Sequence, residues 1–332
     1  MLSKKINEKL WNKNFNEFMD FPTNNLLIDV TNFCNNQCIF CYNNSMLKKR
    51  KFIDFDLCIR VLKEAYELGC REVGFYGTGE PLIDKRLELF IKKAKEIGFS
   101  YIYITTNGIL ANLELIKRLY NAGLNSIKFS INAINAKDYI FIHNTDNFDV
   151  VIKNLTDIYK WKNLNLIPLN VYVSYIATDF TYNPVEINKF FKNKCDELVV
   201  MPAVNQGGLI PGINEFLSSN ITSNINNNFT LPCNYPFNSI FVTVDGYLSA
   251  CCMDFENLLV YADLNKTSLK DAWNCKTIRK FRKMHLEKNV ENTICENCIF
   301  NVKRMPKPLD DKIFVGKCKF KNIEEEIKER RR

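Results

Sequence analysis

Short apolar runs alternate with longer amphipathic segments over the first two-thirds of this chain, and no other feature limits its fold as strongly. The runs predict six strands, at residues 26–30, 72–76, 101–105, 126–131, 169–176 and 197–201. Apolar residues recur at helical spacing between them, which predicts helices that begin at Asp54 and Pro184 and helices at residues 84–97, 112–122 and 147–161. Strands that alternate with helices pair in parallel. The alternation therefore predicts an α/β fold built as a partial (β/α)6 TIM-type barrel.

Three cysteines follow the first predicted strand in the spacing C-x3-C-x2-C, at Cys34, Cys38 and Cys41. Three thiolates in one short loop can hold three corners of a cubane iron–sulfur cluster. Because such clusters are usually held by four cysteines, the fourth iron is left to an outside ligand. The loop lies at the C-terminal end of a strand, which is the edge of a barrel that carries the active site. The sequence therefore predicts a metal cluster with one open coordination position.

This spacing, with the aromatic Phe40 before the last cysteine, resembles the signature of the radical S-adenosylmethionine (SAM) superfamily. The resemblance extends over about residues 26–300. It implies that SAM chelates the open iron through its amino and carboxylate groups. An electron from the reduced cluster then splits SAM into methionine and a 5′-deoxyadenosyl radical, while the protein supplies binding, orientation and exclusion of side reactions.

Loops after the second, third and fourth strands are implied to bind SAM. Residues 76–81 resemble the GGEP motif of the family, with Thr78 in place of its first glycine; glycines let the backbone approach closely, and a carboxylate accepts from an ammonium group. The predicted cofactor-binding residues are Phe40, Gly77, Thr78, Gly79, Glu80, Pro81, Thr105, Asn107, Ser130 and Asn132. Many relatives carry an arginine where this chain has His143 and Asn144, so the partner of the SAM carboxylate stays open.

A second group of cysteines lies in the C-terminal third. Asp245-Gly246 between two β-rich runs predicts a hairpin, and four cysteines surround it in sequence: Cys233, Cys251, Cys295 and Cys298. Four thiolates from a hairpin and a downstream loop can close a metal site, for which structural zinc is one alternative. The pattern, with the helix expected within residues 264–273, resembles the SPASM/twitch domain of radical SAM enzymes. It implies a small cysteine-rich α+β twitch domain (a β-hairpin plus a helix) with one auxiliary [4Fe–4S] cluster, and leaves Cys318 unpaired.

Cys252 and Asp254, next to this group, are the candidate catalytic residues. In related sulfatase-maturing enzymes an aspartate in this region acts as a base, and in peptide epimerases a cysteine returns a hydrogen atom to the substrate radical. The alternative is a small buried apolar residue and a turn carboxylate.

The predicted domains are an N-terminal extension (1–25), the barrel (26–202), a linker or lid (203–232), the auxiliary domain (233–320) and a charged tail (321–332). The net charge is +8, and the basic residues are densest at residues 48–51 and 330–332. Both runs are typical of solvated surface and not of a nucleic-acid site. The first run could also assist an anionic substrate or an electron donor. No apolar run approaches the length of a membrane span, and no secretory signal is evident. Thirteen cysteines without such a signal favour metal sites over disulfides, and a cytoplasmic protein is expected.

The function implied is that of a radical SAM enzyme which abstracts a substrate hydrogen atom, most simply for two-electron oxidation of a small molecule such as a sugar or aminocyclitol. One alternative is epimerisation or crosslinking of a ribosomal peptide with Cys252 as hydrogen donor. The 25 residues before the barrel are few for a leader-binding domain, which favours a small substrate. A second alternative is a non-catalytic metal-binding or electron-transfer protein. The expected partner is a flavodoxin- or ferredoxin-type electron donor.

Overall fold

A single sheet organises the computed structural model, which describes residues 14–217, 230–313 and 316–331. Nine strands of these residues form the sheet in the order β6-β5-β4-β3-β2-β1-β7-β8-β9. Six of them belong to the barrel: β1 (Leu26–Ile28), β2 (Glu72–Phe75), β3 (Tyr101–Thr106), β4 (Ser126–Ser130), β5 (Asn170–Ala177) and β6 (Glu197–Pro202). Every neighbouring pair from β1 to β6 is parallel, which confirms the predicted partial barrel.

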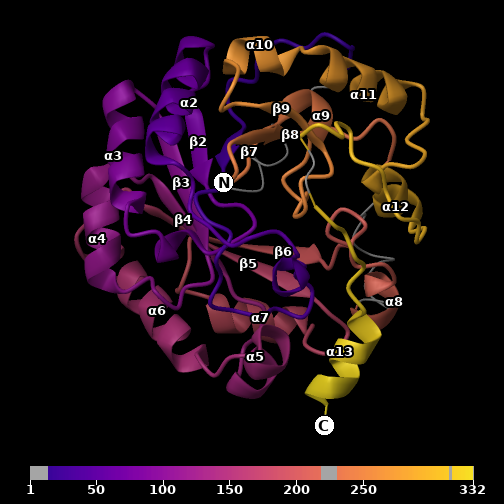
Figure 1. Ribbon diagram of the computed structural model, residues 1–332. Coiled ribbons are helices and arrows are strands. Elements are labelled where there is room, and N and C mark those ends of the chain that lie inside the picture. The colour runs from indigo at the N-terminus through magenta and orange to yellow at the C-terminus, as the bar shows by residue number, and fades with distance from the viewer. Residues whose placement is uncertain (1–13, 218–229, 314–315, 332) are drawn as a thin grey trace.

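Helices cover the outside of the barrel strands (Figure 1). They are α2 (Phe55–Glu67), α3 (Leu87–Ile97), α4 (Leu113–Ala122), α6 (Phe148–Leu164) and α7 (Pro184–Phe191). The predicted start of α2 is confirmed, since the Asp54 side chain accepts a hydrogen bond from the Leu57 amide. Strand β3 alternates between two faces: Ile102 and Ile104 are buried on one, while Tyr101, Tyr103 and Thr105 are half-buried on the other. On this strand the outer face therefore belongs to the core, and the inner face carries side chains with hydroxyl groups.

The sequence analysis missed α5 (Ala136–His143). Its eight residues are mostly apolar on several faces, so helical periodicity is weak, and the side chain of Asn135 caps it by accepting from the Asp138 amide. Two short 3-10 helices, η1 (Asn43–Ser45) and η2 (Pro81–Ile83), also follow barrel strands. These short elements turn out to border the candidate site.

The cysteine-rich segment continues the barrel sheet. Strand β7 (Ile240–Val242) pairs in parallel with β1, and β8 (Tyr247–Ser249) and β9 (Val260–Asp263) follow in antiparallel order. The predicted hairpin is confirmed, because the Thr243 amide donates to the Tyr247 carbonyl and Gly246 adopts a φ of +79°. Strand β9 was not predicted.

Helices of the C-terminal third pack beside this extension of the sheet (Figure 1). They are α9 (Tyr235–Asn238), α10 (Leu269–Trp273), α11 (Lys276–Leu286) and α12 (Ile294–Phe300). The Cys295–Cys298 pair was expected in a loop, and that prediction is wrong, because both residues lie on α12. The N-terminal segment before β1 contacts the same region: Phe15 stacks on Phe237, and the Trp273 indole donates to the Met19 carbonyl.

Residues 203–217, the first half of the predicted linker or lid, include α8 (Ile213–Leu217) and bury Leu209 and Ile210. Residues 218–229 of that segment lie outside the described residues, as do residues 1–13 of the N-terminal extension. None of the helices in the described part of the chain is long and apolar enough to span a membrane.

The C-terminal helix α13 (Ile323–Arg330) contradicts the expectation of a solvated tail. Ile323 and Ile327, one helical turn apart, are buried, and Arg330 donates to the Phe141 carbonyl of α5. A stripe of two isoleucines is too short to stand out from the charged residues around it, although it is enough to dock one turn of helix.

Candidate functional site

The segment between β1 and η1, residues 32–42, is here called the cluster loop. Its backbone is bound by the unpredicted helix α5: the Gln37 amide donates to the His143 carbonyl at 3.1 Å, and the Ile39 amide donates to the Ile142 carbonyl at 2.8 Å. The loop also turns on itself through the Cys41 amide, which donates to the Cys38 carbonyl at 3.0 Å. The end of α5 therefore fixes the middle of the loop.

The cluster loop carries Cys34, Cys38 and Cys41, all half-buried. Burial raises the pKa of each thiol, that of Cys34 to about 12, and proximity to Cys41 contributes to the rise at Cys34 and Cys38. The Asn43 amide points at the Cys41 sulfur at 3.5 Å, and the Asn107 side-chain amide points at the Cys34 sulfur at 4.0 Å. Buried thiols with N–H groups directed at sulfur are the donor set that an iron–sulfur cluster requires.

His143 touches this donor set directly. Its Nδ1 lies 3.1 Å from the Cys38 sulfur and 3.4 Å from the Asn36 amide, and its Nε2 lies 3.4 Å from the Asn132 amide. Burial lowers the pKa of His143 to about 3, so the imidazole is neutral. Phe40 packs edge-on against the same ring. His143 thus links the cluster loop to Asn132.

The loop after β2 is fixed by a buried carboxylate. Thr78 donates its amide and its hydroxyl to the two oxygens of Asp29, at 3.2 and 2.5 Å. A Cβ at Gly77 would stand 2.7 Å from the Asp29 side chain, and one at Gly79 would stand 2.5 Å from the Phe33 carbonyl oxygen and nearer still to that of Thr31. Glycine is therefore required at both positions, because residue 77 lies against the Asp29 side chain and residue 79 against the backbone of residues 31–33.

Glu80 joins the ends of β2 and β3. Its carboxylate accepts from the Thr106 hydroxyl at 2.8 Å, from the Asn107 amide at 2.7 Å and from the Leu82 amide at 3.1 Å. Burial raises the pKa of Glu80 to about 7, against the lowering effect of these three donors. Pro81, the first residue of η2, is buried beside it. The predicted SAM loop is thus a rigid turn whose carboxylate is already bonded to the next strand.

The other predicted cofactor residues lie at the ends of β3 and β4. Asn107 donates to the Asn35 side chain of the cluster loop at 2.6 Å, which brings the third strand end to the cysteines. Ser130 faces Ser174 at 3.3 Å, and Asn132 accepts from the Ile176 amide at 2.7 Å. Thr105 lies on the inner face of β3, in register with Lys128 of β4. The predicted residues therefore gather at one edge of the barrel.

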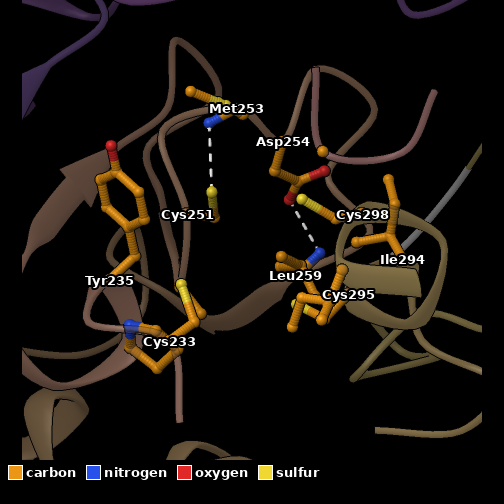
Figure 2. A pocket seen from close by; sticks show the side chains of 13 residues that line it. Cys233, Tyr235, Cys251, Met253, Asp254, Leu259, Ile294, Cys295 and Cys298 are labelled. Atoms are coloured by element: carbon orange, nitrogen blue, oxygen red, sulfur yellow. Dashed lines mark hydrogen bonds between the residues drawn. The ribbon is translucent and has the colours of Figure 1, made fainter. Parts of the chain in front are cut away.

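The second cysteine group surrounds a cavity on the auxiliary side (Figure 2). Cys233 and Cys251 face it from one side and Cys295 and Cys298 from the other. Its remaining walls are largely apolar, with Pro236, Ala250, Leu259, Ile294 and Ile299 among them, although the buried Asp254 also lines it. Burial raises the pKa of Cys233 to about 11 and that of Cys298 to about 12, and the Met253 amide points at the Cys251 sulfur at 3.4 Å. This donor set fits a cluster with four protein ligands.

The sulfur atoms surround the cavity without meeting at a point. Among the residues described, no three Cys, His, Asp or Glu side chains converge as the ligands of a single metal ion do. A tetrahedral zinc ion draws its thiolates to within about 4 Å of one another, given Zn–S bonds of about 2.3 Å. A cubane holds them farther apart, since each thiolate binds a different iron.

Cys252 and Asp254 have different surroundings. Tyr235 provides a hydrogen bond to Cys252, and Tyr76, Tyr103 and Lys128 of the barrel are among its electrostatic neighbours. Asp254 is buried, and its oxygens accept from the Ser249 hydroxyl and from the Leu258 and Leu259 amides at 2.7–2.9 Å. The Cys252 thiol is therefore near the inner face of the barrel, whereas the Asp254 carboxylate closes its own loop.

Several residues of the site carried no recognisable signal in the sequence. His285 accepts from the Cys233 amide at 3.3 Å, and His143 contacts Cys38; that these are the only two histidines of the chain was the available hint. The expectation that both charged runs are solvated is wrong in part. Arg50 of the first run donates to the Asn32 and Asn43 carbonyls, and Arg330 of the second donates to the Gln37 carbonyl.

Comparisons with known proteins agree with this arrangement. Residues 28–168 match the family model of the radical SAM superfamily, and residues 233–299 match that of an iron–sulfur cluster-binding domain, SPASM. A probable GTP 3′,8-cyclase of Methanothermobacter marburgensis is 32% identical over 130 residues, 39% of this chain and 42% of the relative. The chain spans about half the length or less of the curated relatives it matches.

Solved structures share the fold. That of BtrN in complex with AdoMet and 2-DOIA has a TM-score of 0.56 at 21% identity and covers 89% of this chain and 98% of its own. Streptococcus suis SuiB bound to precursor peptide SuiA has a TM-score of 0.61 at 16% identity and covers 95% and 79%. The two family models together match more than half of the chain and show that it belongs to the radical SAM superfamily and carries a C-terminal SPASM domain, the domains that bind SAM and iron–sulfur clusters.

Proposed function

We propose that this enzyme oxidises a carbon centre of a small polyhydroxylated molecule, such as a sugar or an aminocyclitol, by two electrons. Cys34, Cys38 and Cys41 would hold a [4Fe–4S] cluster, which would supply the electron for cleavage of SAM into methionine and a 5′-deoxyadenosyl radical. One hydrogen atom, one proton and one electron would leave the substrate. The four cysteines of the second site would hold an auxiliary cluster able to accept that electron.

The observation that carries this proposal is the closed, apolar second site. Cys233, Cys251, Cys295 and Cys298 all face one cavity, so a cluster there would have four protein ligands and no iron left for substrate. Because β7 pairs directly with β1, the site is also part of the sheet that carries the cluster loop. A fixed, fully ligated centre suits the storage of an electron.

The barrel edge would position SAM. Asp29 and Glu80 hold the loop 77–81 rigid, and its glycine backbone stays close to the cluster loop, where the SAM amino group would bind. Ser130 and Asn132 offer hydroxyl and amide groups to the ribose or carboxylate. In the region where many relatives have arginine this chain has His143 and Asn144, so hydrogen bonds would bind the SAM carboxylate.

The shared fold is compatible with a small substrate and with a peptide. BtrN, whose structure holds AdoMet and 2-DOIA, is covered over 98% of its chain, and anSMEcpe, whose structure holds AdoMet and the Cp18Cys peptide, is covered over 94%. Both structures share little sequence identity with this chain, so they support its architecture, and the substrate must be identified by experiment. An electron donor of the flavodoxin or ferredoxin type and a cytoplasmic location complete the proposal.

Peptide modification is the second candidate, and the position of Cys252 favours it. This thiol has Tyr235, Tyr76 and Tyr103 as neighbours, on the inner side of the sheet, where a substrate radical would form. A thiol so placed could return a hydrogen atom and complete an epimerisation. Asp254 is a weak candidate for a catalytic base, because all its hydrogen-bond contacts are to residues of the β8–β9 segment.

Anaerobic assays in deuterated water separate the two candidates. The enzyme, SAM and dithionite would be incubated with a panel of aminocyclitols and sugars, and separately with short peptides, and products would be followed by mass spectrometry. Oxidation predicts a product two hydrogens lighter, without deuterium, from both the wild type and the Cys252→Ala variant. Epimerisation predicts one deuterium per peptide and loss of product in Cys252→Ala. Absence of 5′-deoxyadenosine in every assay would support a non-catalytic metal protein instead.

A further inference from the structure

Two cations from the C-terminal segment contact the cluster loop from outside. The Lys321 ammonium donates to the Cys41 carbonyl at 2.9 Å, to the Cys38 carbonyl at 3.4 Å and to the Asn44 side chain at 3.2 Å. Lys321 is only 4% exposed. An ammonium group is rarely taken out of water in this way unless its charge is used, because burial of a charge is costly.

Arg330, on the last turn of α13, contacts the same loop. Its guanidinium donates to the Gln37 carbonyl and to the Phe141 and Ile142 carbonyls of α5, the latter two at 2.7 and 3.0 Å. The side chain is 8% exposed. Arg330 therefore joins the cluster loop and the helix that holds it.

The two cations share a single carboxylate. Glu326 pairs with Lys321 at 2.7 Å and with Arg330 one helical turn away. Two positive charges and one negative charge leave this buried group with a net positive charge beside the loop. The two cations lie directly on the loop, since Lys321 donates to the Cys38 and Cys41 carbonyls and Arg330 to the Gln37 carbonyl.

We infer that Lys321 and Arg330 are positioning residues that hold the cluster loop and favour the reduced state of its cluster. Reduction adds one electron to the cluster, here from an external reductant, and a fixed positive charge in a low-dielectric surrounding stabilises the added negative charge. Hydrogen bonds to the Cys38 and Cys41 carbonyls keep that charge at a constant place. The inference rests on the proposed cluster at Cys34, Cys38 and Cys41.

Opposite charge changes at this group provide the test. The Lys321→Met variant removes the positive charge and keeps the length of the side chain, Lys321→Arg keeps the charge, and Glu326→Gln removes the negative charge. The control is Lys328→Met on α13, the helix that carries Glu326, where the exposed ammonium pairs with Glu324 at the surface. Each anaerobically reconstituted protein would be titrated with dithionite and mediator dyes, and the cluster followed by electron paramagnetic resonance.

At a fixed potential we expect the ratio of reduced to oxidised cluster to fall about tenfold in Lys321→Met, which corresponds to about 59 mV for a one-electron couple. Glu326→Gln should raise the ratio, while Lys321→Arg and Lys328→Met should leave it within about threefold of the wild type. Equal ratios in Lys321→Met and the wild type would overturn the inference. So would a shift of Lys321→Met and Glu326→Gln in the same direction, because a purely structural helix contact would weaken in both.

If Lys321→Met loses the cluster, Glu326→Gln alone provides the test. A ratio of reduced to oxidised cluster in Glu326→Gln at or below that of the wild type then overturns the inference. The signal measured is the one that disappears when Cys34, Cys38 and Cys41 are all replaced by alanine. If no signal depends on these cysteines, the proposed cluster site fails. If the signal exists and does not respond to charge, only the role of the C-terminal group fails.

Discussion

The cluster loop draws its three thiols from eight consecutive positions, whereas the auxiliary cavity draws four from three segments between residues 233 and 298. Their surroundings differ as well. Arg50, Lys321 and Arg330 donate to carbonyls around the cluster loop, while no Lys or Arg is among the described residues that line the auxiliary cavity. The first site is therefore local in sequence and charged, and the second is assembled by the fold and apolar.

This difference suits two different tasks. A site that binds SAM and takes up an electron changes its charge and benefits from nearby cations and polar strand ends. A site that only accepts and passes on an electron needs fixed ligands and exclusion of water, which apolar walls provide. Experiments that remove one site at a time can show whether the tasks are in fact divided in this way.

The largest effect is expected from replacing Cys34, Cys38 and Cys41 together by alanine. Formation of 5′-deoxyadenosine should fall to background, and iron should drop from about eight to about four atoms per chain, as expected for the loss of one of two cubane clusters. Iron, sulfide and nucleoside would be measured on anaerobically reconstituted protein. Cys195→Ala, a half-buried cysteine outside both sites, is the control. Retention of SAM cleavage would place the reactive cluster elsewhere.

The complementary change is Cys295→Ala with Cys298→Ala. Iron should again fall by about four atoms, yet SAM cleavage should persist, because the cluster loop is intact; the oxidised product should be lost. Metal analysis and product analysis on the same sample check both parts. One zinc atom per wild-type chain, with iron unaffected by these substitutions, would show that the second site is structural zinc.

A smaller effect is expected at the SAM loop. In Gly79→Ala the new Cβ would overlap the Thr31 and Phe33 carbonyls, so the loop must shift, at a cost of about 1–3 kcal/mol, and the Kd for SAM should rise. The control is Gly69→Ala, which should lower stability by a similar amount. The φ of Gly69 is +98°, a left-handed conformation that costs other residues about 1–2 kcal/mol, and no atom lies within 4 Å of a Cβ added there. If equilibrium dialysis gives equal SAM affinity for both variants, residue 79 has no specific role in SAM binding.

The smallest effect concerns Asp29, whose pKa burial raises to about 6 from an ordinary value near 3.8. A carboxyl with a raised pKa in the folded state stabilises the protein when protonated and loses that contribution as pH rises from about 4 through 6. The free energy of unfolding should therefore fall less between pH 5 and pH 7 in Asp29→Asn than in the wild type, by about 1–2 kcal/mol. Urea unfolding at each pH measures this, with exposed Asp56→Asn as the control, which should follow the wild type.

Much of the barrel was predictable because its signals are local. Alternating apolar runs located all six barrel strands, and the Asp54 cap and the Asp245-Gly246 turn marked a helix start and a hairpin. Helix α5 was missed because its eight residues lack a clear polar face. At α13 a charged helix end was expected, but it was predicted to be solvated, because only two isoleucines among its charged residues face the protein.

The chain by itself determined the chemistry: the spacing of Cys34, Cys38 and Cys41, the glycine-rich turn after β2 and the second set of cysteines are properties of short segments. Only the tertiary structure decided what surrounds them. His143 reaches Cys38 across 105 positions, and the Lys321 ammonium reaches the Cys41 carbonyl across 280. Contacts at such separations depend on how helices and strands pack, and no local pattern of residue types encodes them. A run of charged residues predicts exposed surface, and only the fold shows which of its side chains are buried against backbone carbonyls.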